Sequence, residues 1–169
     1  MKSEMIIREY MPGKSQDDMD HLLDAYLTIW NHPDNLKFLS YTLKPFDEDT
    51  LKSIFSNHIS MGVHYYVANG NNDISGIAVV GAHPIEGFEL IGLGVHHDFK
   101  RKGIGKKLLD YVINIAVVNE YYAVDAIVFA DNMAMLCLLS SVEFIPVHMG
   151  YNLRADGGDT LRMRKRLLS

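Results

Sequence analysis

The residue types best suited to chemistry lie together, where a glycine-bearing basic segment follows an apolar one. Gly103 and Gly105 lack a Cβ atom, so the oxygens of an anion can approach the backbone closely there. Residues 88–95 are expected to form a strand and the residues after Gly103 a helix, whose first N–H groups have no partner within the helix and favour an anion. Positive charge is added by Arg101, Lys102, Lys106 and Lys107. This pattern predicts a phosphorylated ligand.

Two common phosphate-binding motifs do not fit this segment. The Walker motif needs GxxxxGK[ST], and no glycine here begins that pattern. The dinucleotide motif needs GxGxxG, but Leu108 stands where a third glycine should follow Gly103 and Gly105. If the motif began at Gly92, His97 would occupy that third position. An ordinary glycine-initiated helix with a solvated basic face stays open as an alternative.

The same segment resembles the [QR]-x-x-G-x-[GA] pyrophosphate loop of the GNAT superfamily of N-acetyltransferases. Lys100 stands where that family usually has Arg or Gln, which keeps the charge but loses the planar fork of hydrogen-bond donors. Asn132 precedes Phe144 by twelve residues, similar to the family's N…GF spacing, and residues 163–167 look like its frequent final strand.

The resemblance implies acetyl-CoA as co-substrate and a set of residues that hold it. In the family, the strand before the loop splays at a bulge and its free backbone groups hold the pantetheine arm, and Gly94 is compatible with a bulge. The loop then wraps the pyrophosphate, mostly through main-chain N–H groups. The implied binding residues are Leu93, Gly94, Val95, Arg101, Lys102, Gly103, Ile104, Gly105, Lys106 and Asn132.

The implied reaction is direct attack of a primary amine on the acetyl thioester in a ternary complex. The N–H of Val95 is the family-like donor to the developing oxyanion. Glu89 is the leading candidate for the general base, because even spacing should place it on the same strand face as Leu93 and Val95 unless a bulge intervenes. His96 and His97 are alternative bases.

The general acid of the family is not found at its usual position. The family often has a tyrosine seven residues after the Asn, and this sequence has Leu139 there. Its glycine before Phe144 is also replaced, by Glu143. Tyr151 is a further candidate acid, and a thiolate can also take its proton from water.

Periodicity and turn residues predict one α+β domain over residues 1–169, with a mixed, mostly antiparallel sheet flanked by helices. The predicted order is β-α-α-β-β-β-α-β-α-β-β, in agreement with the GNAT fold. His32-Pro33 is expected to end the first helix, and turns are expected at 69–73 and 84–87. Strands are expected at 5–10, 65–68, 74–80, 88–95, 123–130, 144–151 and 160–168, and helices near 19–30, 47–58, 103–115 and 133–142.

Composition excludes several classes of protein. The chain is 48% hydrophobic and 22% charged, as in a folded globular protein, and its net charge of −5 argues against a nucleic-acid partner. The single cysteine cannot form an intrachain disulfide, and no spacing indicates a metal site. No apolar run is long enough to cross a membrane, so we expect a cytoplasmic protein, with a homodimer as one arrangement.

The acceptor amine is not encoded in any motif, and a small molecule or a peptide would serve. Aromatic residues gather in the first quarter of the chain, namely Trp30, His32, Phe38, Tyr41 and Phe46. Acidic residues lie near them, namely Asp24, Asp34, Asp47, Glu48 and Asp49. Such a set would suit a small cationic amine, although core packing with acidic helix starts is the more ordinary explanation. A non-catalytic module that senses acyl-CoA is the alternative function.

Overall fold

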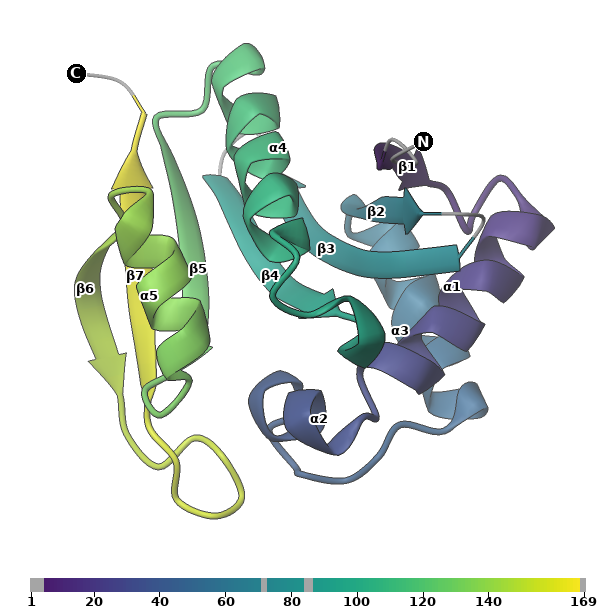
Figure 1. Ribbon diagram of the computed structural model, residues 1–169, viewed down its shortest axis with the longest axis horizontal. Helices are drawn as coiled ribbons and strands as arrows, with labels where there is room; N and C mark the ends of the chain where they lie inside the picture. Colours follow the sequence, from purple (N-terminus) through teal and green to yellow (C-terminus); the bar gives the residue numbers. More distant parts are fainter. Residues whose placement is uncertain (1–4, 71–72, 84–86, 168–169) are drawn as a thin grey trace.

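The computed structural model describes residues 5–70, 73–83 and 87–167. They form one seven-stranded sheet in the order β1-β2-β3-β4-β5-β7-β6, flanked by helices (Figure 1), which confirms the predicted α+β class. The predicted turns at 69–73 and 84–87 lie partly outside the described residues. No helix in the described ranges has the length and apolar character needed to span a bilayer.

The elements follow the expected order with one addition. The strands are β1 (Ile6–Tyr10), β2 (Val63–Gly70), β3 (Asp73–His83), β4 (Gly87–Val95), β5 (Ala123–Phe129), β6 (Ile145–Gly150) and β7 (Thr160–Arg166). The helices are α1 (Gln16–Ile29), α2 (Pro33–Leu39), α3 (Glu48–Ser60), α4 (Ile104–Val118) and α5 (Met133–Ser141), with a 3-10 turn at His97–Phe99.

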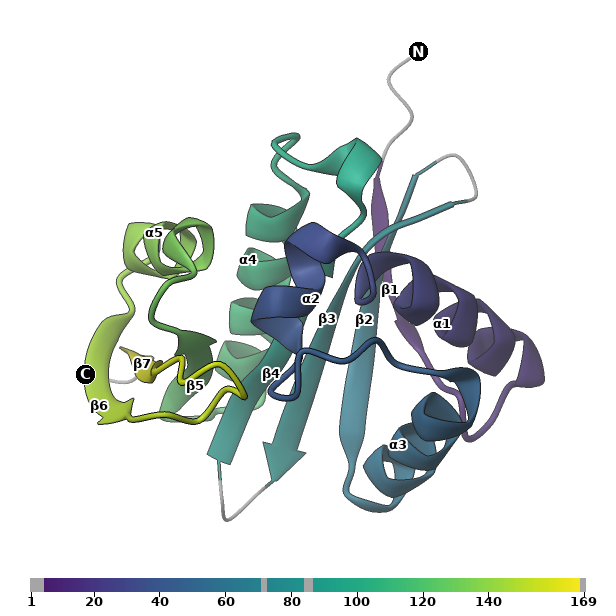
Figure 2. The same ribbon diagram turned by 90° about the horizontal axis from the view of Figure 1, so that it is seen from below.

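Helix α2 is the element that the sequence pattern missed. Pro33 does not only follow the first helix; it opens a second one, at the N-terminal position where proline's missing N–H costs nothing. The His32 Nδ1 caps this helix by accepting from the N–H of Asp34 at 3.3 Å. Figure 1 and Figure 2 together show α2 beside the end where β4 stops.

The sheet separates two apolar cores, because successive side chains of a strand point to opposite faces. On β2 and β3, Tyr66 and Ala78 pack beneath α4, whereas Tyr65 and Val79 pack beneath α1 and α3. Each core is closed by the buried face of its helices, for example Leu108 of α4 and Phe55 of α3. Both faces of the central strands are therefore buried.

A buried arginine ties the C-terminal part of the sheet to α2. Arg154 lies in the segment between β6 and β7, and its guanidinium donates to the carboxylate of Asp131 at 2.8 and 3.0 Å. It also donates to the carbonyl of Lys37 in α2 at 3.2 Å and to Asp156 at 2.7 Å. The guanidinium and the Lys37 ammonium hold the pKa of Asp131 well below its usual range.

Replacing Arg154 by lysine should loosen this attachment, because an ammonium cannot reproduce a planar fork that serves three acceptors. The guanidinium is buried although Asp131 and Asp156 are 42% and 43% exposed, so the lysine loses several charge-assisted hydrogen bonds while keeping its charge. We expect Arg154→Lys to lower the melting temperature by roughly 4–10 °C. Arg166→Lys, at an exposed position of β7, is the matched control and should change it by less than about 2 °C. Equal melting temperatures for the two variants would contradict the assigned role.

Candidate active site

Strands β4 and β5 touch at one end only. They are the parallel neighbours of the described sheet, and they pair over Phe88–Leu90 of β4 and Val124–Ala126 of β5. Beyond Leu90, β4 continues to pair with β3 alone. Figure 1 shows the two strands diverging from that point. One backbone edge of β4 between Gly92 and Val95 therefore faces an open gap.

A β-bulge lies at Ile91, just where the gap begins. Val80 pairs with Leu90 and Val79 with Gly92, so Ile91 is the extra residue on β4. The bulge reverses the alternation of side chains beyond it. Even spacing predicted that Glu89 would share a face with Leu93 and Val95 unless a bulge intervened, and here one does. Leu93 and Val95 pack against the α4 core, whereas Glu89 opens to the other face.

Gly94 has a packing role instead of forming the bulge. A Cβ atom there would lie 2.7 Å from Cζ3 of Trp30 and 2.9 Å from Cγ2 of Ile29. The glycine thus lets the end of α1 approach the strand closely. No sequence pattern distinguishes this use of glycine from a bulge.

The backbone of Val95 presents its N–H to the gap. His96 donates its N–H to the carbonyl of Ser75 on β3 at 2.9 Å, so the alternation of an antiparallel pair directs the groups of Val95 away from β3. The Val95 carbonyl is bonded by the side-chain amide of Asn35, at 3.1 Å. Asn35 also donates to the carbonyl of Ile29, at 2.8 Å, and so ties α1 and α2 to β4.

A cavity of about 410 Å³ lies on the α4 side of the gap. Eight of the ten residues implied to bind the co-substrate line it, namely Leu93, Val95, Arg101, Gly103, Ile104, Gly105, Lys106 and Asn132. Gly94 and Lys102 are not among its lining residues. Gly94 faces Trp30, and Lys102 donates to the carbonyl of Asp98 at 2.8 Å.

The loop at the mouth of this cavity has the backbone shape of an anion site. Arg101 and Gly103 adopt positive φ angles of 59° and 79°. The N–H of Lys107 donates to the carbonyl of Gly103 at 3.0 Å, and no side chain caps the start of α4. The N–H groups at the first turn of α4 therefore point outward without helical partners.

Asn132 and Leu139 occupy structural positions on α5. The Asn132 Oδ1 caps the helix by accepting from the N–H of Met135 at 3.2 Å, which leaves its amide group at the cavity wall. Leu139 is fully buried in the α4 core, so the position where relatives often have tyrosine carries no proton donor. Glu143 takes a positive φ of 68°, the conformation that the family's glycine would favour.

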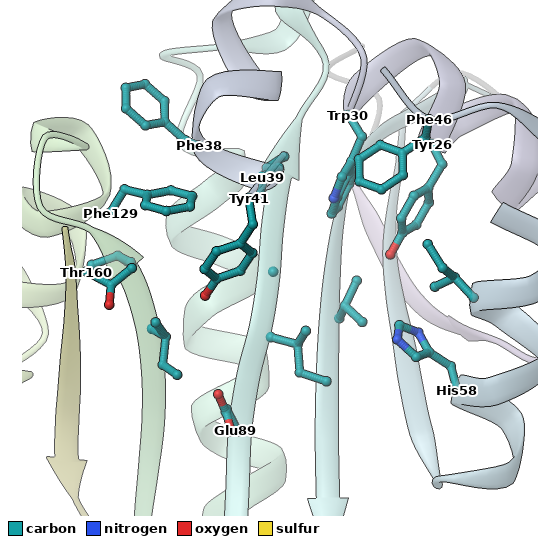
Figure 3. Close-up of a pocket in the computed structure, with 16 residues that line it drawn as sticks. Tyr26, Trp30, Phe38, Leu39, Tyr41, Phe46, His58, Glu89, Phe129 and Thr160 are labelled. Atoms are coloured by element: carbon teal, nitrogen blue, oxygen red, sulfur yellow. The ribbon is translucent and has the colours of Figure 1, made fainter. Parts of the chain in front are cut away.

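A second pocket, of about 240 Å³, lies on the opposite face of the sheet (Figure 3). Of the aromatic residues singled out in the sequence, Trp30, Phe38, Tyr41 and Phe46 line it, and His32 instead stacks on His97. None of the five nearby acidic residues lines it; its carboxylate is Glu89. Tyr26, His58 and Phe129 are lining residues that the sequence did not reveal, because they come from three separate elements.

The pKa values of a carboxyl group and an imidazole in this pocket are both shifted so that the neutral form is favoured. Burial raises the pKa of Glu89, a shift that Arg162 opposes. Burial also lowers the pKa of His58, whose Nδ1 lies 2.6 Å from the hydroxyl of Tyr65. A raised carboxyl pKa lies closer to neutral pH, where a general base is most effective.

The pocket and the cavity meet where β4 and β5 part. A smaller hollow of about 40 Å³ between them is lined by residues 90–93 of β4 and residues 126–128 of β5. Phe38 and Leu39 of α2 line all three spaces. The gap in the sheet is thus a passage between its two faces.

The described residues include one group with ligand atoms close enough for a metal ion, His96, His97 and Asp98. Its donors have other partners, since the His96 Nδ1 accepts from the N–H of Asp98 at 3.3 Å. None of these three residues lines the larger cavity or the aromatic pocket, although the next residue, Phe99, lines the larger cavity. The absence of a metal from the reaction stays a prediction.

The family model of the acetyltransferase (GNAT) family matches residues 17–140. This match covers most of the chain and includes the loop at Gly103, both strands of the gap and α2. The chain therefore belongs to the GNAT family of acetyltransferases, which are acyltransferases. No curated protein sequence matches it significantly.

Solved structures with the same fold agree with this assignment. An N-acetyltransferase from Staphylococcus aureus Mu50 superposes with a TM-score of 0.76 at 22% identity, over 97% of this chain and 99% of that one. The ribosomal-protein-S18-alanine N-acetyltransferase from Escherichia coli gives 0.76 at 18% identity, over 98% and 96%. The protein yncA from Salmonella typhimurium, solved with its cofactor acetyl-CoA, gives 0.72 at 19%, over 99% and 96%.

The role of the loop can be tested at Gly105, where two substitutions separate folding from binding. A Cβ there would make ordinary contacts of 3.5–3.7 Å with Leu93, Leu138 and Val95, so Gly105→Ala should fold and bind acetyl-CoA almost normally. In Gly105→Leu, the added carbons must enter the cavity that these three side chains line. We expect calorimetric titration to show at least a ~100-fold loss of acetyl-CoA affinity, with little change in melting temperature. Full affinity in Gly105→Leu would refute the loop assignment.

Proposed function

We propose that this protein transfers the acetyl group of acetyl-CoA to a primary amine, by direct attack in a ternary complex. The observation that carries the proposal is the passage between β4 and β5, which joins a basic, glycine-lined cavity on one face to an aromatic pocket with a carboxylate on the other. Each substrate can enter from its own side, and the reacting atoms can meet at the passage. Holding two reactants in this way is worth roughly 7–11 kcal/mol of the barrier.

The residues of the larger cavity fit acetyl-CoA, whose thioester supplies the activated acetyl group. The N–H groups at the start of α4 and the side chains of Arg101 and Lys106 would hold the pyrophosphate. Leu93, Ile104 and Leu138 offer an apolar wall to the pantetheine arm. Lys100 would add charge at the mouth; its ammonium lies 3.7 Å from Asp34, an exposed pair that an anion can readily displace.

The N–H of Val95 would stabilise the oxyanion that forms at the acetyl carbonyl. It faces the gap, and its strand is fixed in place by pairing with β3 and by the bond from Asn35 to the carbonyl of the same residue. A donor that is already oriented needs no reorganisation as charge develops.

Glu89 would accept the proton of the incoming ammonium through a chain of water molecules, because six residues of β4, at about 3.3 Å each, separate it from Val95. The amine nitrogen then attacks the acetyl carbon, and the C–S bond breaks as the tetrahedral intermediate collapses. The proton that the nitrogen still carries in excess passes through water to the CoA thiolate, which leaves as the thiol. The structure disfavours His96 and His97 as bases, because neither lines the aromatic pocket. His97 is also stacked between His32 and His96, with ring centres 4.6 and 4.3 Å away.

A non-catalytic acyl-CoA sensor is the second candidate, and the missing tyrosine at Leu139 favours it. Release of free CoA in the presence of an amine separates the two functions. The proposal also includes a small-molecule or peptide acceptor and a cytoplasmic location. It includes no nucleic-acid or membrane partner, and a homodimer is one arrangement of the chain.

Replacing the carboxylate of Glu89 by an amide tests its proposed role as the general base. We expect Glu89→Gln to lower kcat/KM by about 10²-fold and to remove the rise in rate that accompanies deprotonation of Glu89 as pH increases. The raised folded-state pKa means that ionised Glu89 does not favour folding at neutral pH, so the melting temperature there should not fall.

Glu48→Gln, on the exposed surface of α3, is the control for Glu89→Gln. It should leave both the rate and its pH profile as they are. An unchanged pH–rate profile in Glu89→Gln would remove Glu89 as the base.

A further inference from the structure

We infer that the acceptor is a small primary amine whose remaining part is apolar, contains a single ring and carries no carboxylate. The inference rests on the proposed function and assigns the aromatic pocket as the acceptor site. It follows from the kinds of side chain that line the pocket, from their charge and from the pocket's size.

Paired rings make up the walls of the pocket. Tyr26 and Trp30 stack with ring centres 4.2 Å apart, and Tyr41 meets Phe129 edge to face at 5.1 Å. These pairs lie on the two sides of the gap, since the first belongs to α1 and its C-cap whereas Phe129 ends β5. Figure 3 shows the rings directed into one space. Walls of this kind favour binding of a substrate with a flat, apolar ring.

Hydrogen bonds fix the backbone segments that carry some of the rings of this pocket. The side-chain amide of Asn31 donates to the carbonyl of Phe46 and accepts from its N–H, both at 2.8 Å. The N–H of Ala155 donates to the carbonyl of Tyr41 at 2.8 Å. A site with walls fixed in this way selects by shape without first having to order itself.

The charge of the pocket distinguishes between amines. Among the described residues that line it there is no lysine or arginine, and Glu89 is its one carboxylate. An ammonium group therefore finds a counter-charge, and the ring faces also attract a cation. A carboxylate on the substrate would lose its water and face Glu89. Arg162, the cation that acts on Glu89 from outside the lining, already donates to Asp125 at 3.0 Å, so amino acids should be rejected.

The size and polarity of the pocket exclude other common acceptors. Its volume of about 240 Å³ lies below the usual range of about 300–1,000 Å³ for ligand sites, which suits one ring and a short arm. An amino sugar would bring several hydroxyl groups to a lining of mostly rings and aliphatic side chains, whose few neutral polar groups include those of Tyr41, His58 and Thr160. A polyamine would bring a second ammonium with no second carboxylate to meet it.

Three matched amines test the inference, namely phenethylamine, phenylalaninamide and phenylalanine. They share the ring and the amine, and they differ in the group on the α carbon: hydrogen, a neutral amide or a carboxylate. Spermidine, glucosamine and an alanyl peptide complete the panel. CoA release is followed with acetyl-CoA in excess and corrected for the fraction of free amine, and binding to the CoA-loaded protein is measured by calorimetry.

Phenethylamine should exceed phenylalanine by at least ~100-fold in kcat/KM and should bind where phenylalanine does not. Phenylalaninamide should fall between them. Turnover that favours phenylalanine, a sugar, a polyamine or the peptide would overturn this inference and leave the proposed function standing. Acetyl-CoA binding without CoA release for any amine would overturn both.

A substitution then tests the pocket itself. Tyr41 is half exposed, so Tyr41→Ala should fold while removing one wall, and we expect it to raise the KM for phenethylamine by about 10-fold without changing acetyl-CoA affinity. Tyr122→Ala, at a similarly exposed tyrosine outside the pocket, is the matched control and should change neither. Equal KM values for the two variants would show that the amine binds elsewhere.

Discussion

The incomplete pairing of β4 with β5 is the constraint on which the rest of this structure depends. A strand that loses its neighbour exposes N–H and carbonyl groups, and buried groups of this kind need a partner. Here the carbonyl of Val95 is satisfied by Asn35, and its N–H is directed into the gap. The bulge at Ile91 falls at the same point, so one irregularity both opens the sheet and turns Glu89 toward the far face.

Where two strands of a sheet separate, backbone hydrogen bonds no longer join them, and other contacts must hold the two halves together. Besides the short contact of β4 with β5 and the shared core beneath α4, the two halves are joined through α2. The side chain of Asn35 on this helix donates to the carbonyl of Val95, and the carbonyl of Lys37 accepts from the Arg154 guanidinium. Phe38 and Leu39 lie on the same helix, so the seven residues that bridge the halves also line both the larger cavity and the aromatic pocket.

The sequence alone predicted those features that depend on residues close together in the chain. The strand, the glycines and the basic helix start at residues 88–107 predicted the cavity that the fold forms, and the element order predicted its class. It failed where long-range contacts decide. Whether glycine marks a bulge or a close contact depends on Trp30, and the face of Glu89 depends on register with β3. Helix α2 was missed for a local reason, because a proline that can end one helix can equally begin the next. His58 and Phe129 reach the pocket only through tertiary folding.

The contact between Gly94 and Trp30 has an optical consequence. Trp30 is the only tryptophan of the chain, and its indole stands between the strand that forms the passage and the wall of the aromatic pocket. It is 5% exposed and stacked on Tyr26, so its emission reports on a dry, ordered environment. The protein thus carries an intrinsic fluorophore between the passage and the aromatic pocket, so a change in the packing of either one should alter its emission.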